Sequence, residues 1–308
     1  MLVTRHVTLT FTNAVGTSLA MNFHGTFIPQ VLDEDRAQNI HRVEQGGVEG
    51  SIVMGDRPGD LYMELRGQVR RPNMTTEQAV RQLGHVFNQT LPGVMRYRND
   101  NPHISIPTKE IPYRLEKNPK IYWDHNQKIL RFIISMVAPS SFYQGVAHTE
   151  VIAETKKLFR FPHSSPQRRV LRPERPAGFI FASRAEALQS TFNNIGDVRS
   201  GFTATLRARG GTVVNPSIIN VTTGERIRLL VTMAPHDIIT IISTPQERRV
   251  FHNGARAMNR VDAPNTNFFL LGVGENQIGF DADVNVGNMA VYIQYVPLFT
   301  FAESGHNA

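Results

Sequence analysis

The stretch FTATLRARGGTVVNPSIINVTTGERIRLLVTM, residues 202–233, contains the pattern that decides the fold. Residues 202–209 alternate strictly between apolar and polar side chains, which predicts a half-buried strand. Two further apolar runs, residues 218–221 and 227–231, are joined by Thr222-Thr223-Gly224, whose residue types favour a turn. Strand therefore follows strand, with turn chemistry at the junctions.

The same signals continue on both sides of this stretch. Gly210-Gly211 supplies positions that tolerate positive φ and predicts a tight hairpin. Asn253-Gly254 is the strongest short hairpin signal in the chain. Strands at this spacing, separated by turns, predict a β-sandwich for the C-terminal half. Its further strands are expected at residues 178–182, 238–242, 268–271, 277–280 and 289–295.

The N-terminal half also predicts short strands. The near-continuous apolar run 129–137 indicates a strand buried on both faces. The polar stretch 29–50 is too long for a hairpin turn, so it is either an arm or a mobile loop. Residues 55–60, GDRPGD, are expected to form a turn. Strands are expected at residues 5–12, 51–54, 61–69, 94–97, 104–111, 121–124 and 129–137.

One amphipathic helix is expected at about 76–91. Thr75 and Gln78 have the spacing of a capping box, and Leu91-Pro92-Gly93 ends the helical pattern. We interpret the helix as covering one side of a sheet, with a contact between subunits as the alternative. Its apolar side consists of Ala79, Val80, Leu83, Val86 and Phe87.

The net charge of +7 and the pI of about 9.9 raise the possibility of nucleic acid binding. Residues 146–180 carry seven Lys and Arg against three acidic residues, and this segment is rich in proline. We interpret it as a solvated connector, with a contact to a polyanion as the alternative. No alternation of aromatic and basic residues indicates a platform for stacked bases.

The composition also indicates the compartment in which the protein folds. The longest apolar run, residues 268–273, is far shorter than the roughly 20 residues of a membrane-spanning helix. Arg5 and His6 interrupt the first apolar stretch, so no secretory signal is expected. The chain has no cysteine, which excludes disulfides and thiolate metal sites. We expect a protein that folds in the cytoplasm of its producer.

A search for reactive constellations gives no catalytic, cofactor or metal site. The eleven histidines show no HExxH spacing, and no GxSxG motif is present. Gly272-Val273-Gly274 lacks the third glycine and the following helix of a dinucleotide site. Asp281 and Asp283 share one side of a strand end, but a calcium site would need further ligands. We therefore expect no enzyme, no cofactor and no metal.

The chain contains the motifs Asn194-Ile195-Gly196-Asp197, Gly211–Thr223 with Gly224-Glu225, Asn253-Gly254, Phe268–Leu271 with Gly274-Glu275-Asn276, and Val291–Tyr295. Together these motifs resemble those of the distal tail proteins (Dit) of siphophages. The resemblance is densest over residues 194–297, and the N-terminal half fits more loosely. Where the family often has Asp-Pro before an aromatic residue, this chain has Ala138-Pro139 before Phe142-Tyr143.

The resemblance implies a mainly β fold in two domains. Residues 1–145 would form a split β-barrel with one helix and an extended belt, and residues 146–308 a connector and a galectin-like β-sandwich. It further implies a homo-oligomer, a hexameric ring in the virion tail tip that is assembled in the bacterial host cytoplasm. The ring would surround the path of the genome DNA and join the tail tube protein to the tail-tip (Tal) protein, without membrane insertion.

We hypothesise that the arm makes the contact between subunits. The corresponding candidates are Asp33, Glu34, Arg36, Arg42 and Glu44 on the arm, with Leu83 and Phe87 on the helix. In some members of the family the sandwich also carries a receptor-binding protein, and we expect such binding here to be weak or absent. A carbohydrate-binding module that contacts the host cell wall, and a different tail or baseplate protein, are the alternatives.

Overall fold

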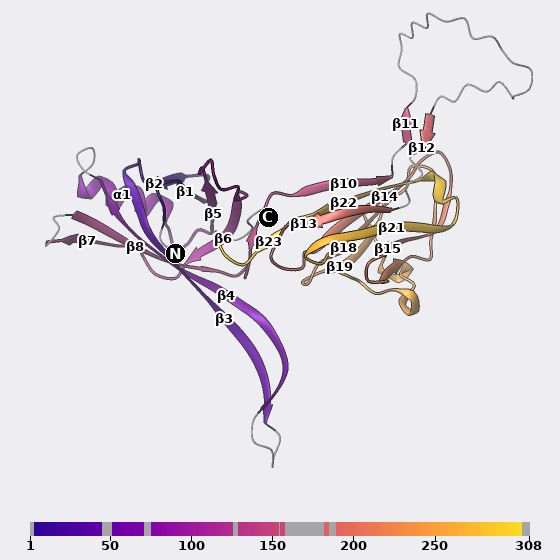
Figure 1. The fold of residues 1–308 in the computed structure, drawn as a ribbon, viewed down its shortest axis with the longest axis horizontal. Coiled ribbons are helices and arrows are strands. Elements are labelled where there is room, and N and C mark those ends of the chain that lie inside the picture. Colours follow the sequence, from indigo (N-terminus) through magenta and orange to yellow (C-terminus); the bar gives the residue numbers. More distant parts are fainter. Residues whose placement is uncertain are drawn as a thin grey trace, which may run out of the picture. The chain divides into compact units, whose positions relative to one another are not determined.

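The computed structural model describes residues 3–44, 51–70, 75–125, 129–153, 155–157, 182–184 and 189–303. The chain divides into two units, each with its own hydrophobic core. The first unit comprises residues 1–146, 196–198 and 297–308, and the second comprises residues 147–195 and 199–296. Within the described ranges the fold is mainly β with one α-helix, so the expected fold class is confirmed (Figure 1).

The first unit is built on one ten-stranded antiparallel sheet with the order β2-β1-β5-β6-β8-β4-β3. β7 pairs with β8, and β9 lies between β6 and β23. β2 and β3 end the order, so the sheet stays open. The elements are β1 (Val7–Asn13), β2 (Ser18–Asn22), β3 (Phe27–Glu44), β4 (Ser51–Val69), α1 (Thr76–Val86), β5 (Gly93–Asn99), β6 (Lys109–Leu115), β7 (Lys120–Asp124), β8 (Ile129–Ala138), β9 (Tyr143–Gln144) and β23 (Leu298–Phe299).

Helix α1 packs against β1, and its C-cap residue Phe87 also contacts β6. Leu83 and Phe87 are fully buried, and the Phe87 ring lies 5.0 Å from that of Phe11 and 6.2 Å from that of Tyr113. Aromatic pairs at such distances add to the stability that area burial provides. The interpretation of α1 as a core-packing helix is therefore confirmed, and neither Leu83 nor Phe87 is accessible to another subunit.

The capping box of α1 is present as predicted. The Gln78 amide donates to Thr75 Oγ1 at 3.3 Å, and the Thr75 amide donates to Gln78 Oε1 at 3.0 Å. The predicted end at about residue 91 is wrong, since the helix ends at Val86. The Asn88 side chain accepts a hydrogen bond from the Thr90 amide at 3.0 Å, and this local turn replaces another helical turn.

The second unit is a two-sheet sandwich with sheets β10-β22-β14-β18-β19-β20 and β13-β21-β15-β16, the latter extended by β17. A separate pair, β11–β12, also belongs to this unit. The elements are β10 (His148–Ala153), β11 (Thr155–Lys157), β12 (Ala182–Arg184), β13 (Gln189–Asn194), β14 (Phe202–Ala208), β15 (Val213–Asn220), β16 (Arg226–Arg228), β17 (Thr232–Met233), β18 (Ile238–Ser243), β19 (Arg248–His252), β20 (Ala255–Arg256), β21 (Gly274–Val284) and β22 (Met289–Tyr295), with 3-10 turns at Met258–Arg260, Ala263–Asn265 and Val286–Asn288.

Two predicted hairpins have different outcomes. Asn253 and Gly254 have φ of 49° and 82° and connect β19 to β20, so the Asn-Gly hairpin is confirmed. The prediction of a hairpin at Gly210-Gly211 is wrong, because β14 and β15, on either side of it, lie in different sheets. Both edges of β14 are already paired, with β18 and β22, so the chain crosses to the opposite layer instead.

Two apolar runs behave differently from expectation. In β8 buried and half-buried residues alternate, so only one face of the strand is fully buried. Residues 268–271 do not form a strand. They fill the sandwich core instead, with the Phe269 ring 5.0 Å from that of Phe202, and make only a bridge between Leu271 and Ser200. Of the strand expected at 178–182, residues 178–181 lie outside the described residues.

Candidate subunit-contact site

A long β-hairpin extends from the sheet of the first unit. β3 and β4 pair along their length, from Phe27 opposite Val69 to Glu44 opposite Ser51. β4 pairs with β8 only from Val69 to Leu61, so the farther part of the hairpin is two-stranded (Figure 1). We call residues 38–58 the arm. The prediction of a turn at residues 55–60 is wrong. These residues are part of strand β4, and shifts in the register between β3 and β4 accommodate the polar run.

The base of the arm carries a buried carboxyl group. The Tyr143 hydroxyl donates to Glu34 Oε1 at 2.5 Å, and Tyr143 is fully buried. Burial raises the pKa of Glu34 above its ordinary value, although the hydrogen bond from Tyr143 acts in the opposite direction. Burial and the neighbouring Glu34 carboxyl together raise the pKa of Tyr143 well above its usual range. The pair fixes β3 against β9.

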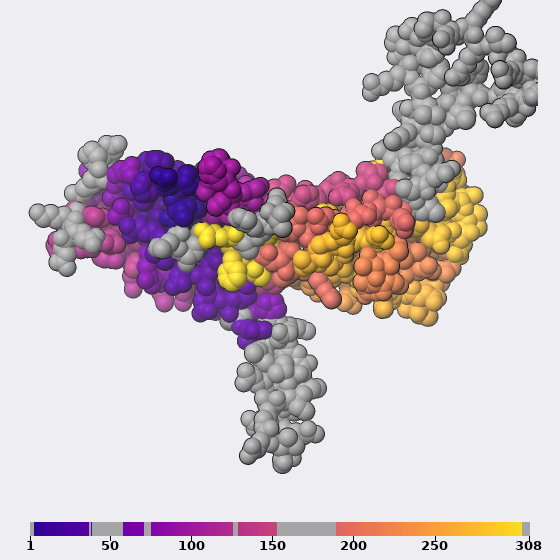
Figure 2. Space-filling model, in the orientation of Figure 1, coloured from indigo at the N-terminus to yellow at the C-terminus, as the bar shows by residue number. Residues whose placement is uncertain are grey.

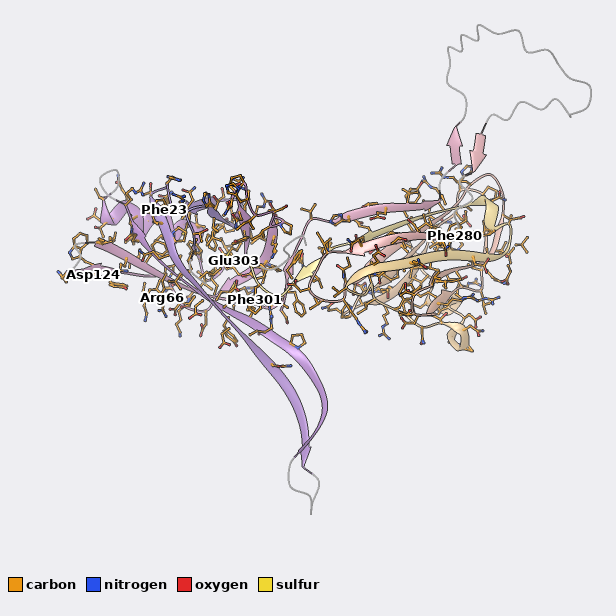
Figure 3. All side chains as sticks on the ribbon, in the orientation of Figure 1. Phe23, Arg66, Asp124, Phe280, Phe301 and Glu303 are labelled. Carbon is orange, nitrogen blue, oxygen red and sulfur yellow. The ribbon has the colours of Figure 1, made fainter. Side chains whose placement is uncertain are left out.

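Arg36 connects the base of the arm to the chain near its C-terminus, at Thr300. Its Nη2 donates to the Thr300 carbonyl oxygen at 2.5 Å. Its guanidinium carbon lies 5.1 Å from the Phe142 ring centroid and 5.8 Å from the Phe301 ring centroid. Arginine stacks favourably on aromatic faces at such distances. Phe301, which is labelled in Figure 3, is 54% exposed, so this contact lies at the surface.

Lys109 is the buried cation of the first unit. Its side chain has no exposed area, and Nζ donates to the carbonyl oxygens of Phe301 at 3.0 Å and Ala302 at 2.9 Å. Desolvation lowers the pKa of Lys109 to about 8, while the negative charges of Asp197, Glu34 and Glu303 oppose that change. Lys109 thereby ties β6 to the last described residues of the chain.

Residues 297–303, the C-terminal segment, are further held by the short link 196–198. Leu298 and Phe299 pair with Gln144 and Tyr143. Asp197 Oδ2 accepts hydrogen bonds from the amide and the hydroxyl of Thr300, both at 2.8 Å. Figure 2 shows yellow C-terminal residues against the indigo and purple surface of the first unit. These contacts explain why residues 196–198 and 297–303 group with the first unit.

The predicted contact residues separate into four groups. Asp33 is exposed, and Glu34 and Arg36 are engaged within the first unit. The side chains of Arg42 and Glu44 lie outside what the structure describes. Leu83 and Phe87 belong to the core. Sequence reasoning missed Lys109, Tyr143, Asp197 and Thr300, since no local motif marks a contact between positions so far apart in the chain.

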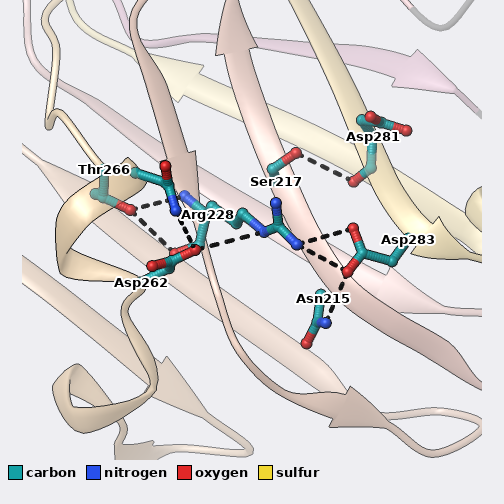
Figure 4. A network of polar contacts seen from close by, with 8 residues as sticks. Asn215, Ser217, Arg228, Asp262, Thr266, Asp281 and Asp283 are labelled. Carbon is teal, nitrogen blue, oxygen red and sulfur yellow. Dashed lines mark hydrogen bonds and ion pairs between the residues drawn. The ribbon is translucent and has the colours of Figure 1, made fainter.

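Of the two carboxylates of the second unit that suggested calcium, Asp283 belongs to a network around Arg228 (Figure 4). Arg228 Nη2 donates to both oxygens of Asp283, at 3.0 and 2.8 Å, and Asn215 Nδ2 donates to the same carboxylate at 2.8 Å. Arg228 Nε lies 3.6 Å from Asp262. The network joins β15, β16 and β21 to the turn at Ala263–Asn265. Among the described residues no group of three or more His, Asp or Glu side chains could hold a metal ion.

No helix in the described ranges is long and apolar enough to span a membrane.

Comparison with known proteins identifies the class. Residues 195–299 match the family model described as siphovirus-type tail component, C-terminal domain. Over the whole chain the fold resembles that of SPP1 Dit, described as a paradigm of the hub adsorption apparatus in phages that infect Gram-positive bacteria. The two share 10% sequence identity with a TM-score of 0.59, over 94% of this chain and 99% of that chain.

A chain of the phage P2 baseplate in its activated conformation with Ca is also similar, at 8% identity and a TM-score of 0.38. That likeness covers 94% of this chain and 97% of the other. No curated protein sequence matches the chain.

The sandwich, the open sheet and the family match together define a structural component of a siphovirus tail. More particularly, residues 195–299 correspond to the C-terminal domain of siphovirus-type tail components, and the chain has the fold of SPP1 Dit.

Proposed function

We propose that copies of this chain form a closed ring at the end of the tail, in which the arm of each copy lies on its neighbour. The ring, hexameric as in the family, joins the tail tube protein to the tail-tip protein and surrounds the path of the genome DNA. Assembly takes place in the host cytoplasm. The chain contributes contacts and no catalysis.

The observation that carries this proposal is the pairing of the arm. Beyond the pair Leu61–Ala138, the described residues of the hairpin strands pair only with each other in the part of the chain that the structure describes. A two-stranded hairpin is at best marginally stable in water, and its free edges are ready to pair with another chain. The arm therefore needs a surface to lie on, and the adjacent copy in a ring supplies one. A head-to-tail contact closes into a ring when its rotation permits.

The base of the arm suits this role because it is fixed in place. Glu34 is bonded to Tyr143, and Arg36 is bonded to Thr300 and lies over the rings of Phe142 and Phe301. A fixed base holds the arm in one direction before the neighbour arrives. Ordering it beforehand lowers the entropic cost of association.

The carbohydrate-binding alternative has less support. Sugar sites usually present an exposed aromatic ring, but the large apolar side chains that are exposed in the described part of the second unit are all aliphatic or methionine. A receptor-binding protein held weakly by the sandwich remains compatible with the hub role.

Shortening the arm tests the proposal. Residues 38–58 are replaced by an Asn-Gly turn, which favours a two-residue hairpin and keeps Glu34, Arg36 and Leu61 in place. We expect multi-angle light scattering to give a ring mass for the wild-type chain and a monomer mass for the variant. The unfolding temperature of the first unit should be retained. A shortened chain that still assembles to the wild-type mass would refute the role of the arm.

A further inference from the structure

The C-terminal segment supplies the contacts that fix Arg36 at the base of the arm. The Thr300 carbonyl oxygen accepts the hydrogen bond from Arg36 Nη2, and the Phe301 ring lies 5.8 Å from the guanidinium carbon. Arg36 Nε is buried and has no hydrogen-bond partner in the described part of the chain. Without the segment Arg36 would keep the Phe142 ring, at 5.1 Å, but would lose its hydrogen bond to Thr300 and the second ring.

Glu34, the other residue of the base, depends on the C-terminal segment in two ways. The backbone of Ala302 forms a hydrogen bond with the Glu34 carboxyl group. The second partner of Glu34 is the Tyr143 hydroxyl, and Tyr143 lies on the two-residue strand β9. Both residues of β9 pair with β23, whereas on the other edge, within the described residues, only Gln144 pairs, with Glu110. The segment therefore also holds the strand that carries the hydroxyl partner of Glu34.

Two groups outside the arm hold the C-terminal segment itself. Lys109 Nζ, on β6, donates to the carbonyl oxygens of Phe301 and Ala302. Asp197 Oδ2, in the link 196–198, accepts hydrogen bonds from the amide and the hydroxyl of Thr300. Neither Lys109 nor Asp197 belongs to the arm or to β9. A change at Asp197 can therefore loosen the segment while the arm and β9 keep their own residues.

The order of the sequence separates the arm from these contacts in time. The arm and its base precede the residues of the second unit in the chain, whereas the C-terminal segment follows them. Arg36 and Thr300 are 264 positions apart, so at roughly 5–20 residues per second Thr300 is synthesised about 10–50 s after Arg36. During that time the arm exists without the residues that fix its base.

We propose that docking of the C-terminal segment on the first unit acts as a latch, which makes the arm competent for assembly once the second unit has been synthesised. This inference rests on the proposed ring and adds a control over when the ring forms. While the segment is undocked, Glu34 and Arg36 lack fixed partners, so each contact with a neighbour includes the entropic cost of ordering the arm. Docking removes that cost beforehand. Unfinished chains are thereby kept out of rings.

Asp197→Ala in the full chain undocks the C-terminal segment. The substitution removes the acceptor of both Thr300 hydrogen bonds, so chymotrypsin should cleave after the buried Phe299 faster than in the wild type. The concentration at which half of the chains reach the ring mass in light scattering should rise about tenfold. Asp100→Ala is the matched control, because Asp100 also accepts two hydrogen bonds in the first unit, from Arg98 at an exposed position. It should leave both measurements unchanged.

An engineered disulfide shows whether docking of the segment is the cause. Gln144 and Leu298 lie directly opposite each other in the antiparallel pair of β9 and β23, at a spacing that a disulfide can bridge. The chain has no cysteine, so Gln144→Cys with Leu298→Cys introduces the only thiols. Added to Asp197→Ala, the oxidised pair should restore assembly at the wild-type concentration, and dithiothreitol should reverse that restoration. In the chain that keeps Asp197, oxidation should leave assembly unchanged.

The outcomes separate the latch from the ring itself. An Asp197→Ala chain that assembles at the wild-type concentration would overturn the latch and leave the proposed function standing. Assembly of the triple variant that is the same with the disulfide oxidised and reduced would also overturn it. A wild-type chain that keeps a monomer mass at every concentration would refute the ring.

Discussion

The ammonium group of Lys109 lies 4.3 Å from the centre of the Phe299 ring, in the interior of the first unit. The ring and the carbonyl oxygens of Phe301 and Ala302 replace water around a charge that has been completely desolvated. The Lys109 side chain thus contacts three residues of the C-terminal segment, Phe299, Phe301 and Ala302.

Lys109→Met should release the C-terminal segment. The substitution leaves two buried carbonyl oxygens without their donor, and we expect the first unit to lose about 2 kcal/mol of unfolding free energy. Urea unfolding measures this loss, and limited proteolysis should cut residues 297–303 faster. Lys117→Met, at an exposed position, is the control. Unchanged proteolysis of the segment in Lys109→Met would contradict the role of the amine.

The buried amine also predicts a pH dependence. The folded pKa of Lys109 is lowered to about 8 from an ordinary value of 10.5. Between these values the unfolded chain binds the proton that the folded chain has released, so the folded state gains stability as pH rises. The unfolding free energy of the wild type minus that of Lys109→Met should therefore increase from about pH 8 to 10.5. A difference that stays flat over this range would contradict the shift.

Glycine substitutions should have opposite effects at two sites of the first unit. A Cβ at Gly67 would clash with the Ile28 carbonyl oxygen and the Phe132 ring, whereas a Cβ at Gly84 meets no atom within 4 Å. Gly67→Ala should cost about 1–3 kcal/mol through overpacking. Gly84→Ala, in α1, should add about 0.5–1 kcal/mol through helix propensity. Thermal unfolding of both variants checks the signs.

Arg228→Met should destabilise the second unit selectively. It leaves the carboxylates of Asp283 and Asp262 without their shared cation, at an expected cost of about 2 kcal/mol. Arg226→Met, two residues away on β16, is the matched control because its side chain forms no ion pair in the described part of the chain. Equal losses in the two variants would show that the network contributes nothing specific.

Local signals predicted the local features well. The Thr75–Gln78 capping box and the Asn253-Gly254 hairpin follow from residues a few positions apart, and both are present. The alternation of residues 202–209 gave β14 to within one residue. In each case short-range sterics and hydrogen bonding decide the geometry.

Features that depend on pairing between strands far apart in the sequence could not be predicted from local patterns. Gly210-Gly211 has hairpin chemistry, but the partners already beside β14 send the chain to the other sheet. The polar stretch 29–50 lacks a strand-like apolar pattern, and the backbone of β4 supplies the bonds that make most of it a strand. The bond from Lys109 to Ala302 joins residues 193 positions apart.

The path of the C-terminal segment has a practical consequence for anyone who dissects this protein. The first unit consists of three separate pieces of sequence, so a fragment ending at residue 146 lacks the groups that satisfy Lys109 and Arg36. Conversely, a fragment that begins at residue 147 has a hydrophobic C-terminal segment, with Phe299 and Phe301, that lacks its partner strand β9. Proteolytic nicking or circular permutation that preserves all three pieces is the sound way to separate the contributions of the two halves.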